Sequence, residues 1–321
     1  AIFRSTCCSG IQNKSPDFAM LIKYRFSVLL RYSLLVAMTI GLLYGCNWRD
    51  KEENIVPNVL RVAVMPDVQE ADLRQRYIPL LEYLTNQIGI PFELITPDSY
   101  GRLLTLFRER KTDISLLGGH QFVESYYRDN AVPLVIRDED LQASSYILVS
   151  GSSKVKSVRG LKGESFSFGD KVSTCGNLVP RYYFKDMDIV PEEFFSRIEY
   201  TAGHDEAAYR VRDGKVFAAV ASGIVIDQMY KEGSLLRSQV RVLWATPPYP
   251  DEVWVVQPNI DRNLQQKLRS AFLGLSMTEP VQAEILMRLN TVGYMPVNIR
   301  DFKKLSDMAI MLKWKTEDAR E

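Results

Sequence analysis

Phe168-Gly-Asp-Lys-Val-Ser-Thr-Cys-Gly-Asn177 links a predicted strand to a predicted helix. Two of its residues, Ser173 and Thr174, carry hydroxyls that can donate hydrogen bonds, and Gly176 allows a close approach of the backbone. The first turn of the following helix adds free N–H groups at the positive end of the helix dipole. Such a loop can bind a tetrahedral oxyanion without a cationic side chain. The same residues also suit a simple helix cap, in which Ser173 or Thr174 accepts hydrogen bonds from the helix.

The sequence around this loop alternates between short strands and longer helices from Val59 onwards. This alternation is typical of βαβ units, in which helices cover both faces of a mostly parallel sheet. A polar joint at 151–160 separates two such units. We therefore predict an α/β fold with two lobes, formed by 58–149 plus 253–321 and by 150–252. A ligand cleft is expected between the lobes, where loops leave the carboxyl ends of the strands.

The first 57 residues do not follow this pattern. Residues 1–19 show neither an apolar period nor an export pattern, and we interpret them as a spurious or disordered extension. Residues 20–45 combine a basic start with an apolar run, which is typical of a signal peptide. Their last residues resemble a bacterial lipobox, so Cys46 is the predicted lipidation site. Residues 46–57 form a predicted tether to the membrane, in the periplasm or at the cell surface.

The composition argues against several other classes of protein. Forty Lys and Arg residues face 39 Asp and Glu residues, so the net charge of +1 gives no global field that would favour nucleic acid. Three of the four cysteines lie within the first 46 residues, which is not a disulfide framework. Two histidines are too few for a His-rich metal site, and we expect no cofactor and no metal. The chain lacks a Walker-type phosphate loop, so energy for transport would come from a partner.

The segment from Phe168 to Pro180 resembles F-G-D-x-x-S-T-S-G-x-x-x-P, a motif of the phosphate, phosphite and phosphonate substrate-binding proteins of ABC transporters. The resemblance spans about residues 58 to 300 and follows the order of that family. The other matching segments are Val62-Ala-Val-Met-Pro66, Tyr77-Ile-Pro-Leu-Leu-Glu-Tyr-Leu84, Ser99-Tyr100, Asp113-Ile-Ser-Leu-Leu-Gly118, Leu161-Lys-Gly163 and Gly203-His204-Asp205.

This resemblance implies a type II periplasmic-binding-protein fold that closes on a small phosphorus oxyanion and has no enzymatic activity. It implies an ABC permease and ATPase as partners, and we expect the protein to be a monomer. Carried over by position, the ligand-binding residues are Ser173, Thr174, Cys175, Gly176, Tyr100 and His204, with His120 as a possible addition. In members that bind aminoalkyl phosphonates, a carboxylate should meet the amine; the unranked candidates are Asp205, Glu206, Asp227 and Asp251.

Two residues depart from the family pattern. Cys175 replaces the second Ser of Ser-Thr-Ser, so a weak thiol donor stands in place of a hydroxyl. Phe122 stands where the family has a Tyr in Gly-Pro-x-x-Tyr, and His120 can compensate for the lost hydroxyl. These departures leave the ligand class in place and its exact member open.

Three alternatives remain open at the level of sequence. A ligand sensor for a signalling partner would use the same closure of the lobes. An organic solute such as a thiamine precursor would need aromatic walls and a cation, for which Tyr182, Tyr183, Trp244, Tyr249 and Arg181 are available. Cys175, His204 and Asp227 also have the residue types of an acyl-transfer triad.

Overall fold

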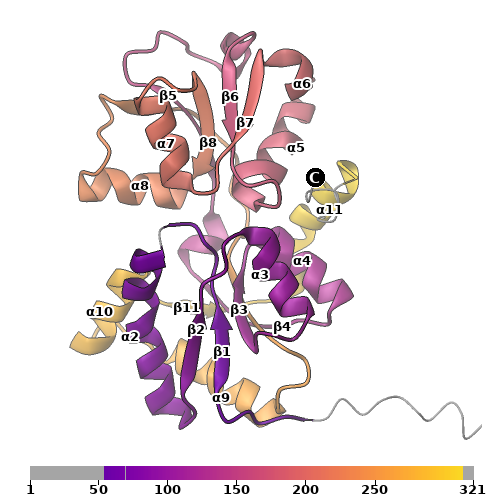
Figure 1. Cartoon of the computed structure of the whole chain (residues 1–321), viewed down its shortest axis with the longest axis vertical. Helices are drawn as coiled ribbons and strands as arrows, with labels where there is room; N and C mark the ends of the chain where they lie inside the picture. The colour runs from indigo at the N-terminus through magenta and orange to yellow at the C-terminus, as the bar shows by residue number, and fades with distance from the viewer. Residues whose placement is uncertain (1–53, 69, 314–321) are drawn as a thin grey trace, which may run out of the picture. The chain divides into compact units, whose positions relative to one another are not determined.

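The computed structural model of the protein describes residues 54–68 and 70–313 (Figure 1). The predicted extension 1–19, the predicted signal peptide 20–45 and the predicted lipidation site Cys46 lie outside the described residues. Within the described residues, no helix has the length and apolar character needed to cross a membrane.

The first lobe is built on a six-stranded sheet in the order β11-β4-β10-β3-β1-β2. Strand β1 pairs in parallel with β2 and β3, whereas β10 runs antiparallel between β3 and β4. The strands are β1 (Leu60–Ala63), β2 (Phe92–Ile95), β3 (Ile114–Leu117), β4 (Val132–Arg137), β10 (Val253–Val256) and β11 (Tyr294–Pro296). The helices that follow or precede them are α2 (Glu70–Ile88), α3 (Tyr100–Arg108), α4 (Gly119–Arg128), α9 (Arg262–Leu273), α10 (Pro280–Arg288), η4 (Ile299–Phe302) and α11 (Lys303–Met311).

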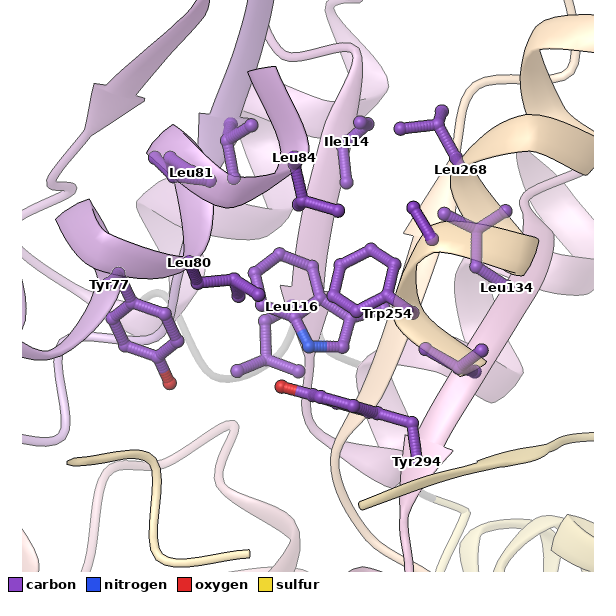
Figure 2. Close-up of a cluster of buried hydrophobic side chains, with 14 of the residues drawn as sticks. Tyr77, Leu80, Leu81, Leu84, Ile114, Leu116, Leu134, Trp254, Leu268 and Tyr294 are labelled. Carbon is purple, nitrogen blue, oxygen red and sulfur yellow. The ribbon is translucent and has the colours of Figure 1, made fainter. Parts of the chain in front are cut away.

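The core of this lobe forms because α2 repeats apolar residues at helical spacing and presents them to the sheet. Figure 2 shows Leu80 and Leu84 directed from α2 toward Trp254 of β10. The ring of Tyr77 meets Trp254 edge-on, with 6.0 Å between the ring centroids. Strand β10 follows the second lobe in the sequence. Its packing against α2 therefore fixes where the chain re-enters the first lobe.

The second lobe is built on a five-stranded sheet in the order β7-β6-β8-β5-β9. Its strands are β5 (Ser145–Ser150), β6 (Ser165–Phe168), β7 (Arg197–Tyr200), β8 (Ala218–Ser222) and β9 (Val240–Ala245). Its helices are η3 (Thr174–Leu178), a π-helical turn, followed by α5 (Val179–Asp186), α6 (Pro191–Phe194), α7 (His204–Arg212) and α8 (Gly223–Glu232). The short helices η1 (Glu139–Gln142) and η2 (Val158–Leu161) flank β5 along the chain.

The structure differs from the sequence-based boundaries at two places. Strand β5 pairs with β8 and β9 of the second sheet, whereas the predicted boundary placed residues up to 149 in the first lobe. An apolar strand carries no local signal of the sheet it joins, so the pattern could not decide this. The predicted tether also ends too late, because Ile55 forms a parallel bridge with Ile260 and its N–H donates to the Asn259 carbonyl at 2.8 Å.

A buried apolar cluster is shared by the two lobes. It contains Tyr100 and Phe122 from the first lobe and Val172 and Tyr183 from the second. Helix α11 packs against both α4 and α5, and it adds Leu305 among other residues to this cluster. The two lobes are therefore joined by packed side chains as well as by the chain crossings.

Candidate functional site

The loop between β6 and η3 is held in a tight conformation by its two glycines. The Gly169 N–H donates to the Gly176 carbonyl at 2.8 Å, and the Ser173 hydroxyl accepts from the Gly176 N–H at 3.0 Å. A Cβ atom on Gly176 would lie 2.8 Å from the Gly169 Cα, closer than real side chains allow. Glycine is therefore required at 176, and the loop presents Thr174 and Cys175 in a fixed arrangement.

This loop faces a small cavity lined by residues of both lobes. Its volume is about 10 Å³, enough for about one water molecule. The lining residues are Met65, Tyr100, Gly118, Gln121, Val172, Ser173, Thr174, Cys175, His204, Asp251 and Glu252.

Three contacts surround this cavity, and the first of them joins the two lobes. The His120 N–H of α4 donates to the Thr174 hydroxyl at 3.0 Å. The Gly119 N–H donates to the Asp251 carboxylate at 2.9 Å. The Cys175 Sγ lies 3.2 Å from the His204 Nε2. These contacts place Thr174, Cys175, His204 and Asp251 around one point, where N-terminal residues of α4 and α7 meet the β6–η3 loop.

The potential donors at this point are neutral. Burial lowers the pKa of His204 to about 4, so its imidazole is uncharged near neutral pH. Burial also raises the pKa of the Cys175 thiol and of the Tyr100 hydroxyl, which therefore keep their protons. A neutral set of hydroxyl, thiol and imidazole groups can bind an oxyanion through dipoles, without a cation.

A carboxyl group stands among these donors. Burial raises the pKa of Asp251 to about 6, and hydrogen bonds from the Gly119 N–H, Thr174 hydroxyl and Cys175 thiol oppose that rise. The carboxyl group accepts from the same donors that an oxyanion would use.

Most of the predicted ligand-binding residues line the cavity together: Ser173, Thr174, Cys175, Tyr100 and His204. Two do not. Gly176 belongs to the loop but does not line the cavity, and its N–H donates to the Ser173 hydroxyl. His120 contributes its backbone N–H to Thr174, and its ring is not part of the cavity wall.

Five cavity residues were not singled out from the sequence: Met65, Gly118, Gln121, Val172 and Glu252. Gln121 orders the first lobe's side of the cavity, because its amide donates to the Tyr100 carbonyl at 2.8 Å and accepts from the Gly118 N–H at 3.2 Å. The available signal in the sequence was the position of Gln121 in the first turn of α4, shortly after the end of β3.

The four candidate carboxylates lie at different places in the structure, and only one of them lines this cavity. Asp251 lines the cavity, whereas Asp205 and Glu206 line a neighbouring cavity of about 510 Å³. Asp227 lies elsewhere and accepts a hydrogen bond from the Tyr146 hydroxyl at 2.9 Å. A second neighbouring cavity of about 570 Å³ lies between α3 and the β6–η3 loop. Asp251 is thus the carboxylate placed to contact a group bound at the cavity.

The aromatic residues considered for an organic ligand pack elsewhere. Tyr183 meets Trp244 edge-on at 5.7 Å, and the Tyr249 hydroxyl is 2.6 Å from the Ser145 hydroxyl. The Arg181 guanidinium bonds Glu192 and the Tyr200 hydroxyl. The described residues that line the cavity include none of these side chains.

The arrangement also lacks the features of a cysteine nucleophile. A reactive cysteine needs a lowered thiol pKa, whereas burial raises that of Cys175. Asp227, the third member of the considered triad, is bonded to Tyr146. Within 54–68 and 70–313, no group of His, Cys, Asp and Glu side chains is arranged to hold a metal ion.

Two α/β lobes that meet around a small cavity have the architecture of two-lobed solute-binding proteins. A family model described as the periplasmic substrate-binding protein of phosphonate ABC transporters matches residues 62–302. The chain belongs to this family. It is therefore a binding component rather than an enzyme, as the sequence predicted, and the family is extracytoplasmic.

Individual relatives agree with this assignment. A probable phosphite-binding protein of an ABC transporter from Prochlorococcus marinus is 24% identical over 264 residues, which cover 78% of this chain and 89% of that protein. The phosphonates-binding periplasmic protein of Escherichia coli is 23% identical over 259 residues, which cover 78% of this chain and 74% of that protein.

Solved structures confirm the predicted type II periplasmic-binding-protein fold. The Prochlorococcus marinus protein in complex with methylphosphonate has a TM-score of 0.75 and 24% identity, and the match covers 80% of this chain and 99% of that one. A binding component of a phosphonate ABC transporter from Pseudomonas aeruginosa has a TM-score of 0.72 and 20% identity, covering 79% and 86% of the two chains.

Proposed function

We propose that this protein binds a phosphonate, phosphite or phosphate-like oxyanion between its lobes and delivers it to an ABC permease and its ATPase. The observation that carries the proposal is the meeting of Thr174, Cys175 and His204 at one buried point with Tyr100 in the cavity wall. These groups are neutral donors, and a buried, hydrogen-bonded anion is favoured by such donors because water is excluded. The methylphosphonate complex of the Prochlorococcus marinus relative supports the ligand class.

Ligand binding must rearrange the present contacts. The cavity of about 10 Å³ is smaller than a tetrahedral oxyanion, and the Asp251 carboxyl group now accepts from Thr174 and Cys175. The ligand would take over these donors, and Asp251 would turn to another partner. In an aminoalkyl phosphonate, the ammonium group is a fitting partner for this carboxylate.

The experiment is thermal unfolding of the purified protein with methylphosphonate, aminoethylphosphonate, phosphite, phosphate, sulfate and a thiamine precursor. A ligand at about one hundred times its Kd should stabilise the native state by roughly 2.7 kcal/mol. We expect a selective shift with one phosphorus oxyanion, and its loss in Ser173→Ala/Thr174→Ala. The matched control is Thr85→Ala, because the Thr85 hydroxyl bonds the Leu81 carbonyl within α2, away from the cavity. A shift only with the organic ligand would contradict the proposal.

The membrane anchor is a separate proposal. We infer that Cys46 is acylated and that the monomeric binding domain is tethered to the membrane through it. The sequence pattern before Cys46 supports this. Mass spectrometry of the protein from membranes should show a lipid adduct on Cys46, and Cys46→Ala should release the protein. An unmodified Cys46 in membrane-bound protein would contradict it.

A further inference from the structure

Arg137 lies at the end of β4 with its side chain only 11% exposed, and all three of its guanidinium nitrogens are engaged. Its Nε donates to the Asp140 carboxylate at 2.6 Å, and its Nη2 donates to the Glu252 carboxylate at 2.6 Å. Its Nη1 donates to the Leu289 carbonyl at 3.0 Å. Arg137 therefore ties together the two chain crossings, because Asp140 precedes β5 and Glu252 precedes β10.

One of these partners belongs to the candidate ligand site. Glu252 lines the same cavity as Thr174 and His204, and it directly follows Asp251 in the chain. The Asp251 N–H in turn donates to the Asp140 carbonyl at 2.9 Å. Arg137 thus contacts Glu252, the neighbour in sequence of Asp251, and the Asp251 carboxyl group accepts hydrogen bonds from the proposed oxyanion donors.

The surroundings of Arg137 carry an excess of acidic groups. Asp67, Asp140 and Glu252 all interact with it electrostatically, and Asp251 adds to the field at Asp140 and Glu252. Other titratable groups that interact with these carboxyl groups are Arg76 and Asp205 near Asp67, Asp138 near Asp140, the hydroxyls of Tyr77, Tyr100 and Tyr294, and the Cys175 thiol. Burial raises the pKa of Glu252 and of Asp140, and the charge of Arg137 opposes both rises.

An anion site beside several carboxylates needs a compensating charge, because like charges repel strongly where water is excluded. We propose that Arg137 is a positioning residue of the ligand site, whose charge balances Glu252 and Asp140 so that an oxyanion can bind next to Asp251. This inference rests on the proposed binding of an oxyanion. It adds a residue that does not line the cavity and that works through the two acidic residues beside it.

The sign of the pH effect follows from this role. Without Arg137, ionised Glu252 and Asp140 would repel the anion, whereas their protonated forms would not. Because the charge of Arg137 lowers both pKa values, its loss raises them further. Loss of Arg137 should therefore matter least where both carboxyl groups are protonated, and increasingly as the pH rises through their raised pKa values. A purely structural loss would weaken binding by the same factor at every pH.

The experiment is calorimetric titration of methylphosphonate into wild-type protein and Arg137→Gln between about pH 5 and pH 8. The readout is the ratio of the two Kd values at each pH. Both proteins meet the same ionised fraction of the ligand at a given pH, so this fraction cancels in the ratio. We expect a ratio near one at the low end and at least about tenfold at the high end, which is about 1.4 kcal/mol. Arg137→Lys keeps the charge and should show a flatter ratio. Arg137→Gln/Glu252→Gln removes both charges and should restore most of the affinity at pH 8.

The matched control is Arg61→Gln, which breaks another arginine–carboxylate pair of the first lobe, with Asp113 at 2.8 Å. Its Kd ratio should stay near one at every pH. If Arg137→Gln fails to fold, Arg137→Lys decides, because it keeps the charge and should bind methylphosphonate about as tightly as wild type at pH 8; a clear loss of affinity at every pH would count against the inference. A pH-independent ratio, or no restoration in the double variant, overturns the inference alone. Wild-type protein that binds none of methylphosphonate, aminoethylphosphonate, phosphite and phosphate overturns the proposed function and this inference with it.

Discussion

Cys175 stands where the family motif carries a second serine, so the site has one weak donor among stronger ones. Its Sγ lies 3.2 Å from the His204 Nε2 and 3.7 Å from the Ser173 hydroxyl, within reach of a shared ligand. We expect Cys175→Ser to tighten methylphosphonate binding by roughly fivefold, the worth of about 1 kcal/mol for an improved hydrogen bond. Calorimetry measures this, with Cys175→Ala as the variant that loses the donor. Equal affinities of the two variants would show that position 175 does not contact the ligand.

His204 makes stability depend on pH. Burial lowers its pKa from 6.5 to about 4, so between these values the unfolded chain binds a proton that the native state does not. The contribution of His204 to stability is therefore lost as the pH falls from about 6.5 towards 4. Relative to His204→Gln, the wild-type free energy of unfolding should fall by about 1.4 kcal/mol for each pH unit within this window. Urea denaturation of both proteins without ligand, at pH 7 and pH 5, gives the difference; a constant difference would mean that His204 has the same pKa in the native state as in the unfolded chain.

Residues of the site that are neighbours in the sequence could be predicted from the sequence alone. Ser173, Thr174 and Cys175 follow one another in a loop, so their common direction could be expected from the sequence. Glu252 reaches the same cavity only because the second crossing passes beside the first. That proximity depends on pairing of distant strands, which the pattern of one segment does not contain. Burial, rather than residue type, separates Asp251 from the other candidate carboxylates.

At the scale of elements, the β6–η3 loop depends on the contact between its two glycines. A methyl group at Gly176 would clash with the Gly169 backbone, so Gly176→Ala should destabilise the native state by about 1 to 3 kcal/mol. Gly101→Ala is the matched control, because nothing lies within 4 Å of its Cβ position in α3 and alanine favours a helix. Chemical denaturation should show no loss for this control. Equal stability of the two variants would show that the loop relaxes easily.

At the scale of elements, long helices can be predicted from the sequence more readily than short helices and strands. Helix α9 has a long and regular apolar period, which the sequence alone can reveal. Pro180 stands near the start of α5, which begins at Val179 after a π-helical turn, and proline is tolerated there because the first turn of a helix needs no N–H from it. Strand β11 and helix α6 have only three and four residues, which is too short for a period that the sequence could show.

At the scale of the whole molecule, α11 stabilises the shared cluster between the lobes. Leu305 of α11 is fully buried there, whereas Ile310 of the same helix is 73% exposed. Leu305→Ala should therefore lower the free energy of unfolding by about 2 to 5 kcal/mol, as for other buried leucines. Ile310→Ala should change it by less than about 0.5 kcal/mol. A similar small effect of both substitutions would show that α11 does not contribute to the core.

The two-lobed plan was predictable because the alternation of strands and helices restarts after a polar joint. The assignment of strands to the two sheets was less predictable. The residues of β5 are apolar enough for either sheet, and only the pairing of β5 with β8 and β9 assigns it to the second. The closeness of the lobes, through the His120 to Thr174 hydrogen bond, is likewise a property of the assembled chain.

Calorimetric titration of methylphosphonate into wild-type protein and into Thr174→Ala tests most directly whether the protein binds a phosphorus oxyanion between its lobes. Thr174 accepts from one lobe and belongs to the other, so it lies where the ligand must be held. We predict saturable binding to wild type, no comparable binding of sulfate, and a loss of at least about tenfold in Thr174→Ala, which corresponds to about 1.4 kcal/mol. Equal binding of methylphosphonate to both proteins would contradict the account of the site.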